Sequence, residues 1–319
     1  MKSFFATSVR TSSACAGASP VRIAVTGATG LIGSALLPAL TSRGHEVHRV
    51  TRSRAEARVG DILWNPETGE LSPGDLEGLE VVIHLAGESV ARHWTADRKQ
   101  RILESRTRGT SLLAQTLARL KRPPSTLVSA SAIGYYGVDA NEAVDESGAN
   151  GRDFLADVVR QWELSAAPAR AAGIRVVHPR IGIVLSPHGG ALERMLPFFK
   201  LGTGGRMGSG RQWMSWISMR DVTGGIQHAI DHVQVSGPMN LVAPHPVQNS
   251  EFTSVLGSVL NRPAVLPVPA LALKLAFGEM ASATVLASQR VIPRVLLDSG
   301  FTFEDQSLES ALRHELTAA

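Results

Sequence analysis

The segment Val21-Arg-Ile-Ala-Val-Thr-Gly-Ala-Thr-Gly-Leu-Ile-Gly33 decides the fold of this chain. A short β-branched strand runs into three glycines at three-residue spacing, and an apolar helical pattern follows. This order gives a tight turn at Gly27, room for a phosphate beside Gly30 and close helix packing at Gly33. The helix N-terminus then offers free N–H groups to an anion. The sequence therefore predicts a dinucleotide site formed by Gly27, Thr29, Gly30, Leu31, Ile32 and Gly33.

Strand and helix patterns alternate after this turn. Strands are expected at 45–50, 81–87, 127–131 and 174–185, and helices at 95–120 and 154–172. Pro168 should disturb the end of the second helix, and Pro179 should interrupt the last strand. The acidic, glycine-containing stretch 139–153 reads as a loop. Alternation of this kind predicts an α/β fold with a doubly wound, Rossmann-type parallel sheet.

The residue composition changes after Ser186. Glycines crowd residues 202–210, prolines become frequent after 236, and helical patterns return at 250–260 and 308–316. A chain of this length favours two unequal lobes. We expect a dinucleotide-binding domain over 21–185, to which 213–235 returns. We expect a smaller C-terminal substrate lobe over 186–212 and 236–319.

The end of the second strand bears on the choice of cofactor. An acidic residue at this point binds the ribose hydroxyls of NAD, whereas a basic residue accommodates the 2′-phosphate of NADP. The chain has Arg52 and Ser53 there and no acid. The sequence therefore predicts NADP, with a surface arginine at a strand end as the alternative. The next strand closes in Ala86 and Gly87, and residues outside the carboxyl end of a parallel strand line the ligand crevice.

Composition excludes several classes of protein. With 44% hydrophobic and 19% charged residues, the chain is of ordinary globular type, and its net charge is only +4. A nucleic-acid role therefore has little support, and a small-molecule substrate is expected. The most apolar stretch, Ala264–Phe277, is interrupted by two prolines and a lysine, so no membrane span is predicted. No metal ligands are predicted, and the oligomeric state is left open.

The compartment is predicted from two features. Cys15 is the single cysteine, which favours a reducing compartment and a cytoplasmic protein. Residues 1–20 are rich in Ser, Ala and Thr and contain no acid. They resemble either a transit peptide, which would place the protein in the plastid stroma, or an ordinary disordered tail. We favour the tail.

The motifs together resemble a known family. They are His84-Leu-Ala-Gly-Glu88, Ser129-Ala-Ser-Ala-Ile-Gly-Tyr-Tyr-Gly137, Gly204-Gly-Arg-Met-Gly-Ser-Gly-Arg-Gln212, Phe277-Gly-Glu-Met280 and Ser288-Gln-Arg-Val-Ile-Pro293. The chain resembles the atypical epimerase branch of the extended short-chain dehydrogenases/reductases. That branch is nucleoside-diphosphate-sugar epimerase-like, some members carry a cell-division-inhibitor (SulA-like) label, and it has a C-terminal domain of unknown function. The resemblance implies an NADP-binding oxidoreductase or epimerase in which Leu85, Ala86 and Gly87 lie along the cofactor.

The chain departs from that family at the acid/base site. Active members use a Ser or Thr with a Tyr-x-x-x-Lys pair, in which the lysine helps the tyrosine to move a proton. Ser131 matches the serine, but Leu155 and Val159 stand where the pair is expected. A non-standard set is therefore predicted, with the catalytic candidates Ser131, Tyr135, Tyr136 and Glu88.

Three alternatives follow from the sequence. Glu88 could bind ribose or cap a helix rather than move a proton. Arg180, at the end of a strand, could face the cofactor or form a structural ion pair. Arg206 and Arg211 could clamp an anionic substrate or lie exposed on a flexible loop. For the whole protein, the alternative to an enzyme is a weakly active or inactive NADP-binding regulator, for which the family label suggests a link to division.

Overall fold

The computed structural model describes residues 20–52, 57–66 and 68–317. Seven parallel strands form the central sheet, in the order β13-β9-β6-β5-β1-β2-β3. They are β1 (Arg22–Thr26), β2 (Glu46–Thr51), β3 (Ile62–Asn65), β5 (Val81–His84), β6 (Thr126–Ser129), β9 (Arg175–Ile181) and β13 (Gly237–Leu241). The short β4 (Glu70–Leu71) is antiparallel to β3, and β7 (Ser131–Ala132) pairs with β9. The predicted α/β, Rossmann-type architecture is confirmed.

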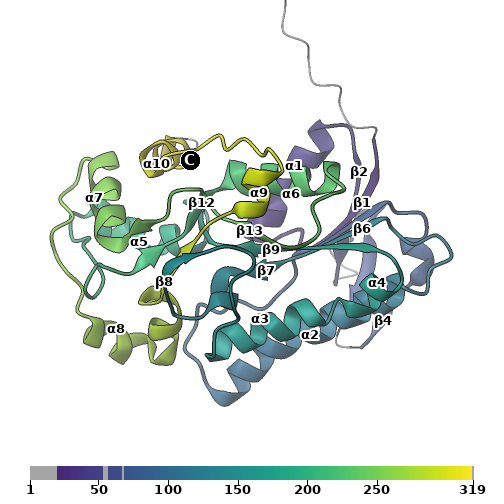
Figure 1. Cartoon of the computed structure of the whole chain (residues 1–319), viewed down its shortest axis with the longest axis horizontal. Coiled ribbons are helices and arrows are strands. Elements are labelled where there is room, and N and C mark those ends of the chain that lie inside the picture. Colours follow the sequence, from purple (N-terminus) through teal and green to yellow (C-terminus); the bar gives the residue numbers. More distant parts are fainter. Residues whose placement is uncertain (1–19, 53–56, 67, 318–319) are drawn as a thin grey trace, which may run out of the picture.

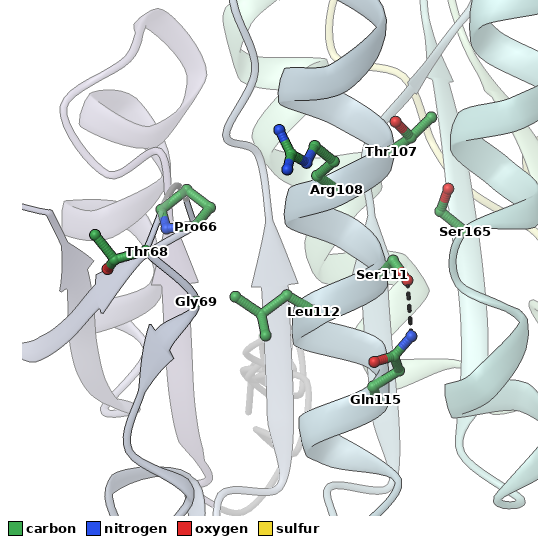
Figure 2. Close-up of a pocket in the computed structure, with 9 residues that line it drawn as sticks. All are labelled: Pro66, Thr68, Gly69, Thr107, Arg108, Ser111, Leu112, Gln115 and Ser165. Carbon is green, nitrogen blue, oxygen red and sulfur yellow. Dashed lines mark hydrogen bonds between the residues drawn. The ribbon is translucent and has the colours of Figure 1, made fainter.

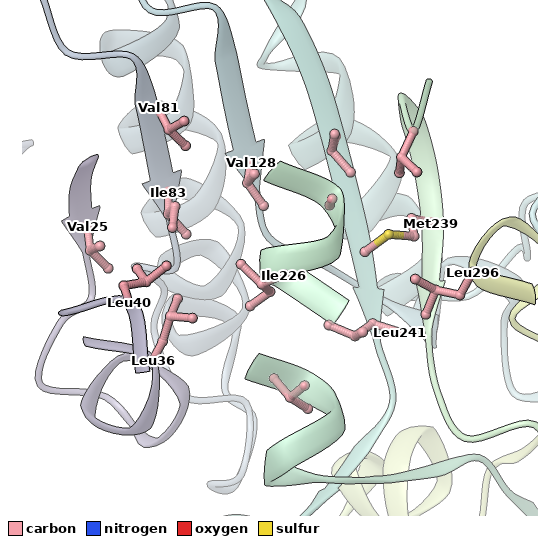
Figure 3. Packing of buried hydrophobic residues seen from close by; sticks show 14 of the residues in the cluster. Val25, Leu36, Leu40, Val81, Ile83, Val128, Ile226, Met239, Leu241 and Leu296 are labelled. Atoms are coloured by element: carbon pink, nitrogen blue, oxygen red, sulfur yellow. The ribbon is translucent and has the colours of Figure 1, made fainter. Parts of the chain in front are cut away.

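Helices cover both faces of this sheet (Figure 1). One face carries α1 (Leu31–Ser42), α6 (Met219–Asp231) and α9 (Arg294–Asp298), and the other carries α2 (Ala96–Leu117), α3 (Phe154–Leu164) and α4 (Ala167–Ala171). Side chains of β1 alternate between the faces: Ile23 and Val25 belong to the first core, and Ala24 belongs to the second. Figure 3 shows Val25 and Ile83 of the strands packed near Leu36 and Leu40 of α1.

A further core lies beside the sheet. It joins α5 (Gly190–Lys200), α7 (Asn249–Val259) and α10 (Leu308–Thr317), together with β10 (Ile183–Leu185) and β12 (Trp216–Ser218), which pair with each other. The other elements of this end are β11 (Trp213–Met214), β14 (Val247–Gln248) and α8 (Ala270–Phe277). Gly189, just before α5, contacts Leu31 in the glycine-rich turn, so this core adjoins the predicted dinucleotide site.

The expected loop 139–153 is wrong in its first part. Residues Asp139–Val144 form β8, which pairs in parallel with β15 (Ser288–Val291). The Ser288 hydroxyl also donates to the side-chain oxygen of Asn141 (2.6 Å). The segment is polar because most of its side chains are exposed, and its partner lies far away in sequence. Local composition therefore concealed the strand.

Two prolines act differently from their expected effects. Pro168 does not disturb the end of one long helix but lies in the first turn of a second, α4, where its missing N–H costs nothing. Pro179 lies inside β9, and the strand ends at Ile181. Gly182 follows, where a Cβ would lie 2.4 Å from the Ser215 carbonyl oxygen. The expected domain boundary at residue 236 falls directly before β13. This strand nevertheless belongs to the central sheet, because it is hydrogen-bonded to β9.

Candidate functional site

The glycine-rich turn has the geometry of an anion cradle. Gly27 has a φ of +67°, and a Cβ there would lie 2.8 Å from the carbonyl carbon of Leu85. At Gly33 a Cβ would lie 2.2 Å from the Gly27 carbonyl oxygen. No side chain caps the start of α1, whose first turn contains no acid. These features fit a dinucleotide phosphate, because the turn is close-packed behind and offers backbone N–H groups in front.

A buried hydrogen-bonded chain holds the end of β5 against this turn. The Thr26 hydroxyl lies 2.7 Å from Nδ1 of His84 and accepts the N–H groups of Leu85 and Ala86. On its other side, His84 Nε2 lies 3.1 Å from the Thr110 hydroxyl of α2. Burial lowers the pKa of His84 to about 4. The neutral imidazole therefore fixes the wall formed by residues 85–87.

Ser131, Glu163 and Arg180 meet at the same edge of the sheet. The Ser131 hydroxyl donates to Oε1 of Glu163 (2.6 Å), and Arg180 binds both oxygens of that carboxylate, at 2.8 and 2.9 Å. Burial alone would raise the pKa of Glu163, but the hydrogen bonds and charge of Arg180 lower it overall. Glu163 is therefore an ionised carboxylate that accepts a hydrogen bond from the Ser131 hydroxyl. The Ser131 oxygen keeps its lone pairs free to accept a hydrogen bond from another donor. Arg180 forms the structural ion pair left open by the sequence.

The two tyrosines differ in the hydrogen bonding of their hydroxyl groups, and therefore in their suitability for proton transfer. The Tyr136 hydroxyl accepts from Arg180 (2.9 Å) and donates to the side-chain oxygen of Asn240 (2.7 Å), and burial raises its pKa to about 12. Such a phenol holds its proton and stabilises the fold. The Tyr135 ring lies against Arg180, with 3.4 Å between the guanidinium carbon and the ring centroid. Among the described residues, the Tyr135 hydroxyl has no hydrogen-bond partner.

Apolar side chains fill the place of the usual Tyr-x-x-x-Lys pair. Leu155 and Val159 of α3 both face Gly134, in the loop after Ser131, where a Cβ would lie 3.7 and 3.9 Å from them. Val159 is buried. At these two positions of α3 no titratable side chain faces the segment after Ser131, as the sequence indicated.

Other predicted residues lie apart from this cluster. The Glu88 carboxylate pairs with the Arg98 guanidinium, which also donates to the Ser89 carbonyl. Arg52 is exposed directly after β2, and Ser53 lies outside the described residues, as do residues 1–19 of the expected tail. Arg206 donates to the carbonyl oxygens of Gly208 and Ser209 in its own loop.

Sequence reasoning missed Glu163, Asn240 and Glu146. Glu163 had a usable signal, since it lies four residues beyond Val159 on the same helical face. Asn240 and Glu146 had none, because they are 94 residues apart and meet only in the folded chain: the Asn240 backbone N–H donates to Oε1 of Glu146 (2.8 Å). Burial raises the pKa of Glu146.

A surface depression of about 620 Å³ lies elsewhere (Figure 2). It is lined by α2, the turn before β4 and Ser165, and none of the predicted site residues lines it. Within the described ranges, no cluster of three or more His, Cys, Asp or Glu side chains could hold a metal ion. No helix in the same ranges is long and apolar enough to cross a bilayer.

The curated relatives match along nearly the whole chain. An epimerase family protein of Mycobacterium bovis is 44% identical over 296 residues, which cover 92% of this chain and 97% of that protein. The chloroplastic epimerase family protein SDR39U1 homolog of Arabidopsis thaliana is 38% identical, and the match covers 92% of this chain and 86% of that protein. The family model of the NAD dependent epimerase/dehydratase family matches residues 23–242, and a domain of unknown function (DUF1731) matches 268–315.

Solved structures agree with these sequence matches. The human epimerase family protein SDR39U1, crystallised with NADPH, is 34% identical, has a TM-score of 0.86 and matches over 93% of this chain and 100% of its own. The sheet, the glycine-rich turn and the family model coincide on the same residues. The chain therefore belongs to the NAD dependent epimerase/dehydratase family, in the form that carries the C-terminal domain of unknown function.

Proposed function

We propose that this protein is an NADP(H)-dependent oxidoreductase or epimerase that acts on a small hydroxyl- or carbonyl-bearing molecule, with nucleotide sugars as first candidates. The observation that carries the proposal is the Ser131–Glu163–Arg180 cluster, which lies at the carboxyl edge of the same sheet as the uncapped glycine-rich turn. The glycine-rich turn would hold the cofactor phosphates, and Arg52 would neutralise the 2′-phosphate. When bound, the nicotinamide supplies the hydride acceptor or donor.

Ser131 has the role of orienting the substrate oxygen. Because its proton is donated to Glu163, its oxygen accepts a hydrogen bond from a substrate hydroxyl. Tyr135 is the proposed proton donor and acceptor, since its hydroxyl is not engaged by the residues described around it. Tyr136 and Glu88 are held by Arg180 and Arg98 and have supporting roles in this proposal.

A second candidate is an NADP(H)-binding regulator with little turnover. The apolar packing of Leu155 and Val159 favours it, because the usual lysine and tyrosine are replaced by groups that move no proton. Cofactor binding would survive in this case, since the glycine-rich turn is intact.

Binding and turnover separate the two candidates. Calorimetric titration with NADPH, NADP⁺ and NADH should give the tightest binding to the phosphorylated forms. Incubation with carbonyl compounds and sugar nucleotides, followed by absorbance and by chromatography of the sugars, should reveal reduction or epimerisation. Ser131→Ala should lower either activity by roughly 100-fold or more while leaving NADPH binding within about threefold. Tight binding without any conversion favours the regulator, and absence of binding to every dinucleotide contradicts both.

The proposed compartment is the cytoplasm. The name of the Arabidopsis relative keeps the plastid as the alternative. Fusion of residues 1–20 to a fluorescent protein tests this directly: import into isolated chloroplasts supports the plastid, and exclusion supports the cytoplasm.

A further inference from the structure

Arg106, on α2, is a half-buried cation without a carboxylate partner in the described part of the chain. Its Nη1 donates to the Ile102 carbonyl one turn earlier on the same helix (3.1 Å), and its guanidinium lies 5.1 Å from the centroid of the Trp162 ring. Burial lowers its pKa to about 10, which Glu88 opposes and Arg98 reinforces. Most of its N–H groups are therefore left for a further acceptor.

The nearby acid is already neutralised. Glu88 pairs with Arg98, which is itself buried. Two guanidinium groups and one carboxylate therefore meet at the end of β5, and one positive charge remains in excess. A partly desolvated charge without a partner is unfavourable for folding, and a bound anion would compensate it.

The Arg106 guanidinium lies next to Gly87, just beyond the carboxyl end of β5. The Arg106 guanidinium carbon lies 3.6 Å from the place where a Cβ of Gly87 would be. Gly87 is exposed and follows Leu85 and Ala86, which pack against Gly27. The guanidinium thus lies one strand away from the glycine-rich turn, at the carboxyl edge where α/β proteins bind ligands.

We propose that Arg106 binds an anionic oxygen group, a phosphate or a carboxylate, of a molecule held in this crevice. The inference rests on the proposed function, because the cofactor and the substrate are the two sources of such an anion. A planar guanidinium with free N–H groups suits both groups, which it can bind with two parallel hydrogen bonds.

The test compares Arg106→Gln and Arg106→Lys with Arg108→Gln. Arg108 lies on the same helix, is 71% exposed and, among the residues placed in the structure, pairs only with Glu104 one turn away, so its variant controls for loss of one charge. Dissociation constants for NADPH and for UDP-glucuronate, which carries both phosphates and a carboxylate, are measured by calorimetry. Thermal unfolding is followed with and without inorganic pyrophosphate.

Arg106→Gln should weaken at least one ligand by roughly 10- to 100-fold, Arg106→Lys less, and Arg108→Gln less than twofold. Weaker NADPH binding identifies the cofactor phosphates as the anion, and weaker UDP-glucuronate binding alone identifies the substrate. The melting temperature of Arg106→Gln should change little, because removal of an unpaired charge offsets the loss of the hydrogen bond to Ile102 and of the contact with Trp162. Unchanged affinity for both ligands in an Arg106→Gln protein that still unfolds cooperatively overturns the inference.

Failure of the proposed function has a different signature. If the unsubstituted protein binds no dinucleotide and no sugar nucleotide, that proposal fails. The role of Arg106 is then decided by pyrophosphate. A stabilisation that Arg106→Gln abolishes supports an anion site, and an equal stabilisation in both proteins excludes it.

Discussion

Leu155, Val159 and Glu163 succeed one another at four-residue intervals on one face of α3. The family uses this face for its proton-moving pair, and here its first two positions are apolar. The third carries the carboxylate that holds Ser131 and Arg180. The sequence alone showed that the Tyr-x-x-x-Lys pair is absent, because leucine and valine at its two positions are enough to establish that. The sequence did not show that Glu163 holds Ser131, because Glu163 takes this role only in contact with Arg180, which lies on a separate strand.

At the same scale, buried histidines make stability depend on pH. His84 and His178 are almost fully buried, and burial lowers the pKa of each to about 4. The unfolded chain takes up these protons near pH 6.5. Between pH 6.5 and 4 the unfolded state therefore binds more protons, and the free energy of unfolding falls as the pH falls. A pKa difference of this size corresponds to on the order of 3 kcal/mol per histidine.

Urea unfolding at a series of pH values checks this expectation. His84→Gln should lose stability at pH 7 but should show a shallower decline between pH 6.5 and 4. The exposed His188 provides the control, since His188→Gln should keep the full decline. An equal decline in His84→Gln and in the unsubstituted protein would show that His84 does not contribute.

Among the elements, those defined by local pattern were predicted and those defined by distant partners were not. The helix 96–117 begins at Thr95, whose hydroxyl accepts from the Arg98 N–H as expected of an N-cap. β8 has no such local signal, because it is stabilised by β15 from the far end of the chain. The same distinction explains the site: the glycine-rich turn was readable as one segment, whereas the Ser131–Glu163–Arg180 cluster draws on three, β7, α3 and β9.

The glycine-rich turn gives the sharpest prediction for a single element. Gly27 and Gly44 both have positive φ, but a Cβ at Gly44 meets nothing within 4 Å, whereas one at Gly27 meets the backbone of Leu85 and Ala86. Gly44→Ala should cost about 1–2 kcal/mol of unfolding free energy and leave NADPH affinity unchanged. Gly27→Ala should cost about 2–5 kcal/mol and abolish measurable binding.

Urea unfolding and calorimetry on both variants measure these effects. Alanine at either position would adopt an unfavourable positive φ. The difference in unfolding free energy between the two variants therefore reports the contact of the new Cβ with residues 85–86. Retention of NADPH affinity in Gly27→Ala would mean that the cofactor does not lie on this turn.

For the whole molecule, the segment matched by the domain of unknown function completes the other cores. Leu296 of α9 belongs to the cluster on the sheet, and Leu308 and Leu312 of α10 belong to the neighbouring core. The buried carboxylate of Asp221, on α6, accepts the backbone N–H groups of Glu304 and Asp305. The C-terminal segment therefore contributes side chains to both the core on the sheet and the neighbouring core, and it packs as part of them.

Truncation after Pro267 should consequently prevent stable folding. Burial of each lost leucine contributes about 2–3 kcal/mol, and three of them together approach the net stability of a typical domain. The truncated chain should show no cooperative urea transition and should bind a hydrophobic dye, whereas Leu312→Ala should unfold cooperatively with a loss of about 2–5 kcal/mol. A truncated protein that unfolds cooperatively at the midpoint of the full chain would instead make the sheet and its helices self-sufficient, and the C-terminal segment would then have to be explained by function alone.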